Sequence, residues 1–279
     1  MTRRALLIGI NRYQLPDADL RGCLNDVAQL RELLTGLHGF AERDIAVLAD
    51  FEATTSAIQR GLEQLIESAG AGDVLLVHYS GHGSAVPDTS GDETDLRDEI
   101  LCPTDLDWKA PLRDDWLRAL FDTVGADVNL TVLMDCCHAG TNTRESLALG
   151  GERSVQRYLP YPLDLLPVDL SRDLVGGLRA GRARAVGKDV SDVMEVDAPE
   201  IVIAGSRDDE TAAEALIGGV FAGALTDALV STIREAKGKL SHRELHAGAT
   251  RRLAGRFRQT PQLAGRSARL DRQLLEPFA

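Results

Sequence analysis

One stretch decides how this chain folds: Val132-Leu133-Met134-Asp135-Cys136-Cys137-His138-Ala139-Gly140. A second stretch has the same design upstream, Val77-His78-Tyr79-Ser80-Gly81-His82-Gly83. Each predicts an apolar strand that ends abruptly in small, polar and reactive residues. If both strands are parallel and finish at one edge of a sheet, a thiol and an imidazole meet there. Cys137 as nucleophile and His82 as base are the pair that a cysteine hydrolase needs.

Working outward, short apolar runs alternate with helical patterns along most of the chain. This alternation favours parallel strands joined by crossover helices, with helices on both faces of an α/β sheet. Several strand candidates lack polar alternation, as expected for strands covered on both faces. We expect strands over Ala5–Ile10, Asp44–Ala49, Asp73–Tyr79, Leu130–Met134 and Glu200–Ala204. We expect helices over Leu24–Leu34, Thr54–Ser68, Asp114–Thr123, Val220–Ala236 and His242–Phe257.

The regular pattern breaks between about residues 141 and 198. This segment contains Gly150-Gly151, Gly176-Gly177 and many arginines, with little clear periodicity. A long irregular insertion inside a compact domain is unusual and tends to be functional or disordered. We therefore expect one domain over residues 1–279, with a first part (1–140), a flexible linker (141–198) and a second part (199–279).

Composition excludes several classes of protein. The chain has no apolar run of membrane-spanning length and no signal-peptide pattern at its start. Four cysteines, two of them adjacent, do not make a disulfide framework, so we expect a cytoplasmic protein. A formal charge of −12 argues against nucleic acid and anionic membranes as partners and favours a basic substrate. An acidic surface that only keeps the protein soluble would give the same charge.

The adjacent cysteines cannot both serve as the nucleophile. Neighbours on an extended chain point to opposite sides, so only one of Cys136 and Cys137 can face His82. A zinc chelate is disfavoured because its cysteines are usually two to four residues apart. The N–H groups of Gly83 and Cys137 are candidate donors to the oxyanion of a tetrahedral intermediate.

These motifs resemble the caspase-like (clan CD, C14) cysteine peptidases, and within them the metacaspase and bacterial orthocaspase branch. Asp-Cys-Cys-His-Ala-Gly at 135–140 is similar to the branch's Asp-Ser-Cys-His-Ser-Gly, and Ser-Gly-His-Gly at 80–83 resembles its histidine motif. Leu-Arg-Gly-Cys-Leu-Asn-Asp at 20–26 resembles the segment after its first strand. Residues 208–214, 218–221 and 259–263 resemble its small-subunit motifs.

The resemblance implies a caspase-like three-layer sandwich around a mostly parallel six-stranded sheet. It also implies a monomer that hydrolyses peptide bonds through an acyl-enzyme. Cys137, rather than Cys136, would be the nucleophile, and His82 the general acid and base. The alternative is an inactive caspase-like scaffold that binds peptides, against which the intact Cys137, His82 and Gly83 argue.

Two carboxylates suggest the substrate preference. Asp26 and Asp135 both fall at the expected catalytic edge, and carboxylates in one pocket repel each other unless a cation neutralises them. An Arg side chain can do so with two hydrogen bonds. The resemblance also implies that Asp26, Ser80 and Asp135 bind a basic P1 residue, the residue before the cleaved bond. A helix cap at Asp26 and a loop role for Asp135 are the structural alternatives.

If the protein cleaves after Arg or Lys, the basic residues of the linker are candidate self-cleavage sites, because proteolytic nicking concentrates in exposed Gly-rich loops. Solvation of a flexible loop explains the same residues almost as well. The candidate self-cleavage sites are Arg144, Arg153, Arg157, Arg172, Arg179, Arg182, Arg184 and Lys188.

An acidic stretch follows the histidine motif. Calcium takes six to eight oxygen ligands, and the stretch does not match an EF-hand. It resembles the metacaspase segment that binds an activating Ca²⁺, with Asp98, Asp114 and Asp115 as the best matches. A solvated acidic loop with a helix cap at Asp114 is the alternative. The acidic residues are Asp88, Asp92, Glu93, Asp95, Asp98, Glu99, Asp114 and Asp115.

Overall fold

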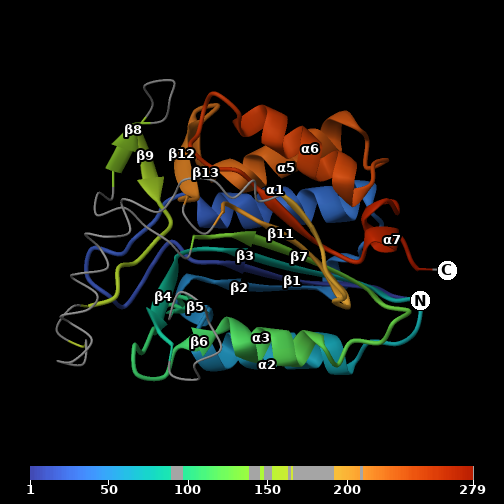
Figure 1. Cartoon of the computed structure of the whole chain (residues 1–279), viewed down its shortest axis with the longest axis horizontal. Helices are drawn as coiled ribbons and strands as arrows, with labels where there is room; N and C mark the ends of the chain where they lie inside the picture. The colour runs from blue at the N-terminus through green and yellow to red at the C-terminus, as the bar shows by residue number, and fades with distance from the viewer. Residues whose placement is uncertain are drawn as a thin grey trace.

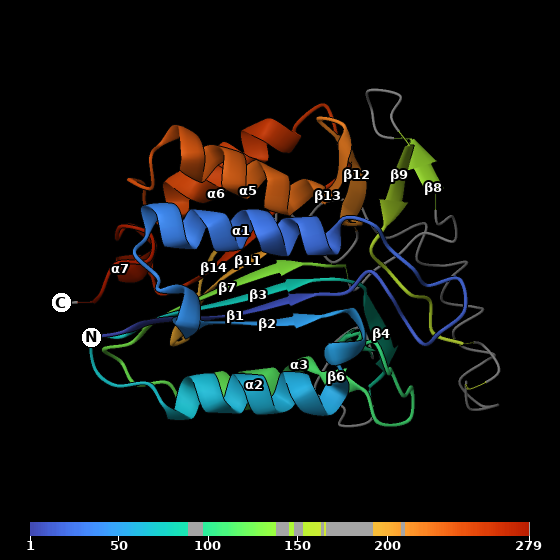
Figure 2. The same cartoon turned by 180° about the vertical axis from the view of Figure 1, so that it is seen from behind.

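The structure is a computed structural model that describes residues 1–88, 97–137, 145–147, 153–162, 165, 192–207 and 210–278. Within these residues a central sheet separates two layers of helices (Figure 1). Two smaller sheets lie at the end of the central sheet that is opposite both chain termini (Figures 1 and 2).

The central sheet is mostly parallel. Only the edge formed by β14 and β10 departs from this, because β14 runs antiparallel to β11. In spatial order, its strands among the described residues are β10 (Val193–Glu195), β14 (Gln262–Gly265), β11 (Glu200–Ala204), β7 (Asn129–Asp135), β3 (Val74–Ser80), β1 (Arg3–Gly9) and β2 (Ile45–Ala49). The carboxyl ends of β3 and β7 meet in register, with Ser80 opposite Asp135.

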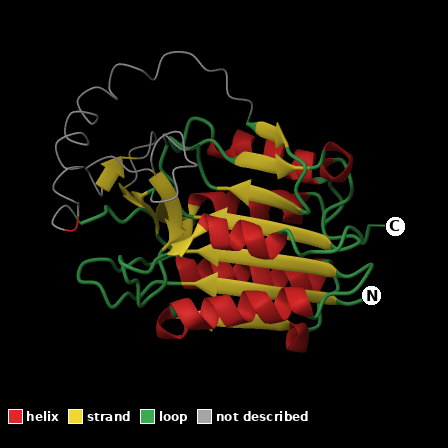
Figure 3. Cartoon of the chain, turned by 60° about the horizontal axis from the view of Figure 1, so that its bottom comes forward, coloured by secondary structure: helices red, strands yellow, loops and turns green. Residues whose placement is uncertain are grey.

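Helices cover both faces of this sheet (Figure 3). One face carries α1 (Cys23–Leu37), α5 (Ala224–Glu235) and α6 (His242–Leu253), and the other carries α2 (Thr55–Glu67) and α3 (Asp114–Phe121). Shorter elements are η1 (Glu42–Asp44), η2 (Asp50–Glu52) and α7 (Ser267–Leu270). Local chemistry sets the helix starts: the Thr54 side chain accepts the Ala57 N–H at α2, and Ser241 and Glu244 form a capping box at α6.

Strand alternation decides which side chains reach the α1 face. On β3, Leu76 packs into the apolar cluster beneath α1 and α5, whereas Leu75 packs into the cluster over α2 and α3. Because side chains alternate with a period of two, Ser80 faces the same way as Leu76. Asp135 likewise shares the face of β7 that points toward α1, and Cys136 belongs to the opposite cluster.

The two smaller sheets frame the carboxyl ends of β3 and β7. Both are antiparallel throughout. The first, among the described residues, consists of β13 (Val220–Gly223), β12 (Ala213–Ile217), β9 (Arg153–Gln156) and β8 (Glu145–Leu147). The second consists of β4 (Gly83–Pro87), β5 (Arg97–Leu101) and β6 (Leu112–Arg113). Since β4 begins at Gly83, the histidine motif leads directly from the central sheet into this second sheet.

The expected three-layer α/β sandwich is confirmed, with two corrections. The central sheet has seven strands in the described part of the chain, not six, because Val193–Glu195 adds an edge strand beside β14. The helix expected over Val220–Ala236 begins at Ala224, because Val220–Gly223 form a strand paired with β12. The expected linker, 141–198, thus contributes β8, β9 and β10.

No helix among the described residues is long and apolar enough to span a membrane.

Gly9 fixes the distance between β1 and the helix that carries Asp26. A Cβ at this position would lie 2.7 Å from Cγ2 of Val27 and 2.9 Å from the Cys23 carbonyl oxygen, both in α1. We expect Gly9→Ala to lower the free energy of unfolding by about 1–3 kcal/mol through overpacking, measured by urea denaturation. Gly36→Ala is the matched control: nothing lies within 4 Å of its Cβ. It should raise helix stability by about 0.5–1 kcal/mol. Unchanged stability of Gly9→Ala would mean that α1 moves away without cost.

Candidate active site

Asp26 lies in the first turn of α1 and is fully buried. The N-cap residue of α1 is Gly22, so Asp26 does not cap its own helix. Its carboxylate accepts hydrogen bonds from the Ser80 hydroxyl (2.8 Å) and from the Gly223 N–H (2.9 Å). The three residues come from α1, β3 and β13, so one carboxylate connects three elements.

Asp135 ends β7 and is also fully buried. Its Oδ2 accepts hydrogen bonds from the Thr226 N–H (2.8 Å) and the Thr226 hydroxyl (2.6 Å). That hydroxyl has one proton, so it accepts from Nε2 of His78 at 3.2 Å. Burial lowers the pKa of His78 to about 4, so this histidine is neutral and orients the threonine toward Asp135. Sequence reasoning had not identified Thr226.

A basic residue of the chain itself fills the space between these carboxylates. Arg157 is fully buried, with Nη2 2.7 Å from Oδ2 of Asp26 and Nη1 3.1 Å from Oδ1 of Asp135. Nη1 also donates to the backbone carbonyl of Asp135 at 3.1 Å. Each terminal nitrogen of the guanidinium therefore has a different carboxylate as its partner.

Glu214 supplies a third buried carboxylate, which sequence reasoning missed. Its Oε2 lies 3.8 Å from Nη2 of Arg157. Its oxygens also accept the backbone N–H groups of Arg21 and Gly22, which precede α1. An acidic residue directly after the small apolar pair Ala212-Ala213 was the available signal, but its contacts are almost 200 positions away in the sequence.

The crowding of carboxylates affects proton binding. Burial raises the pKa of Asp26 to about 6, although the Arg157 cation acts to lower it and the Asp135 charge raises it further. Burial also disfavours the charged guanidinium, but Asp135 and its acidic neighbours outweigh this and raise the pKa of Arg157. The pocket is therefore built for one cation, held against three carboxylates away from water.

The backbone of Arg157 is hydrogen-bonded through both its carbonyl and its N–H. Its carbonyl oxygen accepts the N–H of Cys137 at 3.2 Å and the N–H of Gly83 at 3.1 Å. Its own N–H donates to the Ala212 carbonyl at 3.0 Å, which extends the antiparallel pairing of β9 with β12. The two N–H groups expected to stabilise an oxyanion thus hold one carbonyl oxygen of this chain.

The two cysteines lie in different surroundings. Cys137 is buried against β12, where its Sγ accepts the Ala212 N–H at 2.9 Å. Burial raises the pKa of the Cys137 thiol to about 12, so with the pocket filled it is protonated and needs a base. Cys136 packs into the apolar cluster on the α2 side of the sheet, away from Arg157. None of the four cysteines forms a disulfide.

His82 directly precedes the Gly83 N–H that holds the Arg157 carbonyl. Its Nε2 lies 2.8 Å from the carbonyl oxygen of Ala18, and a carbonyl can only accept, so Nε2 carries the proton. In the neutral ring Nδ1 is then the nitrogen that can accept a proton. The centroid of the Tyr13 ring lies 5.0 Å from that of the imidazole, and the Tyr13 hydroxyl accepts the backbone N–H of His82 at 2.8 Å.

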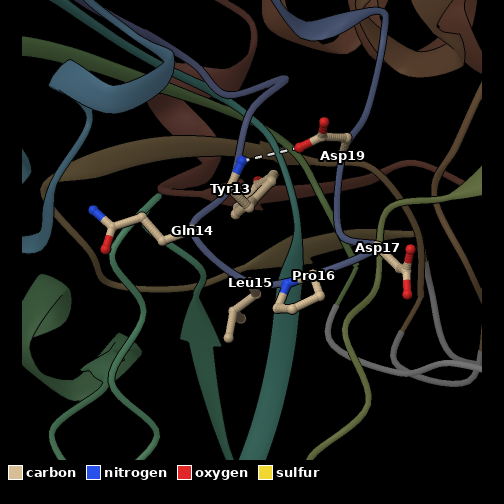
Figure 4. Close-up of a pocket in the computed structure, with 6 residues that line it drawn as sticks. All are labelled: Tyr13, Gln14, Leu15, Pro16, Asp17 and Asp19. Atoms are coloured by element: carbon tan, nitrogen blue, oxygen red, sulfur yellow. Dashed lines mark hydrogen bonds between the residues drawn. The ribbon is translucent and has the colours of Figure 1, made fainter.

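The loop that orients His82 also borders a cavity. Ala18 and Tyr13 both belong to the segment between β1 and α1, which borders a cavity of about 450 Å³. Figure 4 shows the residues that line this cavity. It is lined by Tyr13, Gln14, Leu15, Pro16, Asp17 and Asp19.

The expected calcium ligands are paired with arginines. The buried Asp98 of β5 forms an ion pair with Arg113, and Asp114 forms one with Arg118 at 3.2 Å. Asp115 follows in the first turn of α3. No group of three or more His, Cys, Asp or Glu side chains that could hold a metal occurs among the described residues.

Several expected positions lie outside the described residues, and for Arg153 only the backbone is described. Those outside are His138, Asp92, Glu93, Asp95, Arg144, Arg172, Arg179, Arg182, Arg184 and Lys188.

Comparisons with known proteins show which family this chain resembles. A family model described as "Metacaspase, peptidase C14 domain" matches residues 3–144. Metacaspase-1B of Aspergillus terreus is 32% identical over 287 residues, covering 94% of this chain and 74% of that protein. Metacaspase-7 of Arabidopsis thaliana is 41% identical over 163 residues, covering 56% of this chain and 40% of that protein.

The fold has a match among solved structures. The crystal structure of a Geobacter sulfurreducens protein superimposes with a TM-score of 0.69, at 26% identity and with all of both chains covered. Some relatives are longer than this chain. The alignment with Metacaspase-1 of Eremothecium gossypii, at 30% identity, spans 94% of this chain but 63% of that protein.

Removing the buried cation tests the pocket's electrostatics. We expect Arg157→Gln to lower the free energy of unfolding by about 3–5 kcal/mol at pH 7.5, because it leaves buried carboxylates uncompensated. The loss should be smaller at pH 5. A carboxyl with a raised folded-state pKa stabilises the fold at low pH and loses that contribution as pH rises through about 6. Urea denaturation at both pH values measures the difference.

The matched control is Arg234→Gln, which removes a half-exposed pair with Glu32. A surface pair contributes at most about 1 kcal/mol, and its loss should not depend on pH over this range. An Arg157→Gln effect equally small and equally independent of pH would contradict the charged-pocket interpretation.

Proposed function

The chain belongs to the metacaspase family of C14 peptidases, and we propose that it is a cysteine endopeptidase that cleaves after Arg or Lys. One observation carries the proposal. Arg157 contacts the carboxylates of Asp26 and Asp135, while its carbonyl oxygen lies between the N–H groups of Cys137 and Gly83. A substrate held for acyl transfer needs both contacts at once: a recognised side chain and a polarised carbonyl.

The pocket favours Arg over Lys as the P1 residue. Both terminal nitrogens of Arg157 are paired, one with Asp26 and the other with Asp135. A planar guanidinium can span two carboxylates on different elements, whereas a Lys ammonium is a single point charge. An acidic P1 side chain would be repelled by all three carboxylates.

The proposed reaction begins with attack by Cys137. Sγ forms a bond to the substrate carbonyl carbon, and the thiol proton passes to Nδ1 of His82. The C=O electron pair moves onto oxygen, where the N–H groups of Cys137 and Gly83 stabilise the negative charge. Collapse breaks the C–N bond, and His82 returns the proton to the departing amine.

Hydrolysis then releases the acyl group. Water attacks the thioester carbonyl and gives a proton to Nδ1 of His82, which passes it back to the sulfur as the C–S bond breaks. The Ala18 carbonyl keeps Nε2 protonated throughout, so the same ring nitrogen serves both half-reactions.

The same geometry supports self-processing. The bond between Arg157 and Tyr158 follows the carbonyl held by Cys137 and Gly83. Arg157 is the candidate site in the linker whose side chain is described, and that side chain lies in the acidic pocket. We therefore take this bond as the self-cleavage site.

Calcium activation, a monomeric state and a cytoplasmic location remain predictions from the sequence. Because Arg113 pairs with Asp98, the calcium prediction depends on displacement of that arginine and on ligands outside the described residues. No step of the proposed reaction depends on the metal.

Specificity is tested with fluorogenic peptides that differ only in Arg, Lys or Asp at P1. We expect the peptide with Arg at P1 to be cleaved faster than the one with Lys, and the one with Asp not to be cleaved detectably. Each assay is run once with millimolar Ca²⁺ and once with EGTA, which tests calcium dependence separately. Cys137→Ala should abolish activity, and Cys136→Ala should retain it because that thiol faces the α2 side. Loss of activity in Cys136→Ala alone would overturn the nucleophile assignment, and cleavage after Asp would overturn the pocket.

Self-cleavage is tested by mass spectrometry of the purified chain. We expect fragments 1–157 and 158–279. Cys137→Ala should yield no fragments, and Arg157→Gln should not be cut between residues 157 and 158. Cys136→Ala is the matched control that should still cut. Fragments that end elsewhere in the linker would contradict the assignment of Arg157, although not the peptidase activity.

A further inference from the structure

We infer that this active site also selects the residue two positions after the cleaved bond, through an apolar subsite beside β4 that Leu159 fills in this chain. The inference rests on the proposed function, because it takes Arg157–Tyr158 as the bond in the catalytic position. The subsite would bind the part of the substrate after the cleaved bond, which departs as the amine product and does not contact the acidic pocket.

The backbone after Arg157 continues as an ordered strand. Tyr158 pairs in parallel with Gly83: the Gly83 N–H donates to the Arg157 carbonyl, and the Leu159 N–H donates to the Gly83 carbonyl at 3.0 Å. The buried Ser84 hydroxyl then donates to the Leu159 carbonyl. Gly83 thus holds the polarised carbonyl with its N–H and fixes the following residues with its C=O.

The Leu159 side chain is anchored in the core. It is only 3% exposed and belongs to the same apolar cluster as Tyr13 and Val86. Tyr13 is the residue that contacts His82, and Val86 lies on β4, so this cluster adjoins the catalytic histidine. Departure of Leu159 would leave apolar side chains of the cluster without a neighbour, and a substrate side chain of similar size would replace it.

The next positions distinguish a subsite from general burial. Pro160 is exposed, so the third residue after the bond has no comparable contact. Tyr161 is partly buried and packs edge-on against Trp108 with ring centroids 5.4 Å apart. Contact alternates along the segment, as expected for an extended peptide on a strand, and Leu159 is its most deeply buried member.

The substrate class that fits is a peptide with a basic residue before the cleaved bond and a large apolar residue at the second position after it. In a hydrophobic pocket, a substrate that lacks one methylene group is disfavoured by about 10–200-fold in kcat/KM. We expect kcat/KM to fall by at least ten-fold when Leu at this position is replaced by Ala.

The test uses the full chain and internally quenched peptides copied from residues 154–161. The reference is Ser-Val-Gln-Arg-Tyr-Leu-Pro-Tyr. The test peptide replaces Leu by Ala, and the matched control replaces Pro by Ala. A coumarin amide of Ser-Val-Gln-Arg, which lacks every residue after the bond, reports the acidic pocket alone.

A selective loss with the Leu-to-Ala peptide, and none with the Pro-to-Ala peptide, supports the subsite. Equal rates for all three peptides while the coumarin amide is cleaved overturn the subsite and leave the proposed function standing. No cleavage of any substrate, including the coumarin amide, would remove the proposed function and the subsite with it.

In self-cleavage, Leu159→Ala should slow the cut after Arg157, whereas Leu165→Ala, at a half-exposed position, should not. Equal rates for these two variants would also count against the subsite.

Discussion

The ion cluster around Arg157 is the interaction on which the site depends. One guanidinium is held by Asp26 of α1, Asp135 of β7 and Glu214 of β12, all cut off from water. The fit leaves no spare room: a Cβ on Gly223 would lie 2.2 Å from Asp135 and 2.3 Å from Arg157. Buried ion pairs are weak evidence for net stability, because desolvation offsets their attraction. Their effect here is on register, because only one alignment of β9 on β12 brings a cation to the carboxylates and its carbonyl to Cys137.

The central sheet and the position of the reactive residues were predictable from the sequence. Apolar runs at strand length, followed by Gly, His and Cys, located β3 and β7, and the period-two alternation separated Cys136 from Cys137. The hairpin of β12 and β13 was missed because Val220–Gly223 was joined to the following helical pattern. Gly218 and Gly219, both with positive φ, form the two-residue turn, and a Gly-Gly pair between apolar residues predicts such a hairpin.

The place of Arg157 in the carboxylate pocket was not predictable. Nothing in the local sequence marks Arg157, whose contacts are with a strand more than fifty positions later and a helix more than a hundred positions earlier. Glu214 was missed for the same reason, since its role depends on the backbone of Arg21 and Gly22. Contacts of this range depend on the folded sheet, so local patterns contain little information about them.

The occupied pocket has a consequence for the energetics of catalysis. Arg157 is covalently connected to β7 through residues 138–156, and cleavage after Arg157 leaves that connection intact. The new terminus would keep its guanidinium among the same three carboxylates, at the high effective concentration that a covalent connection provides. Under the proposed function, a substrate therefore competes with a tethered arginine for the same charges, and its own P1 residue gives it no electrostatic advantage. The segment after the cut bond is also connected to the central sheet, through the residues that lead to β10. A substrate therefore competes on that side with Leu159, and it gains the contacts with Gly83, Ser84 and the cluster around Leu159 only when the new amino-terminal segment leaves them.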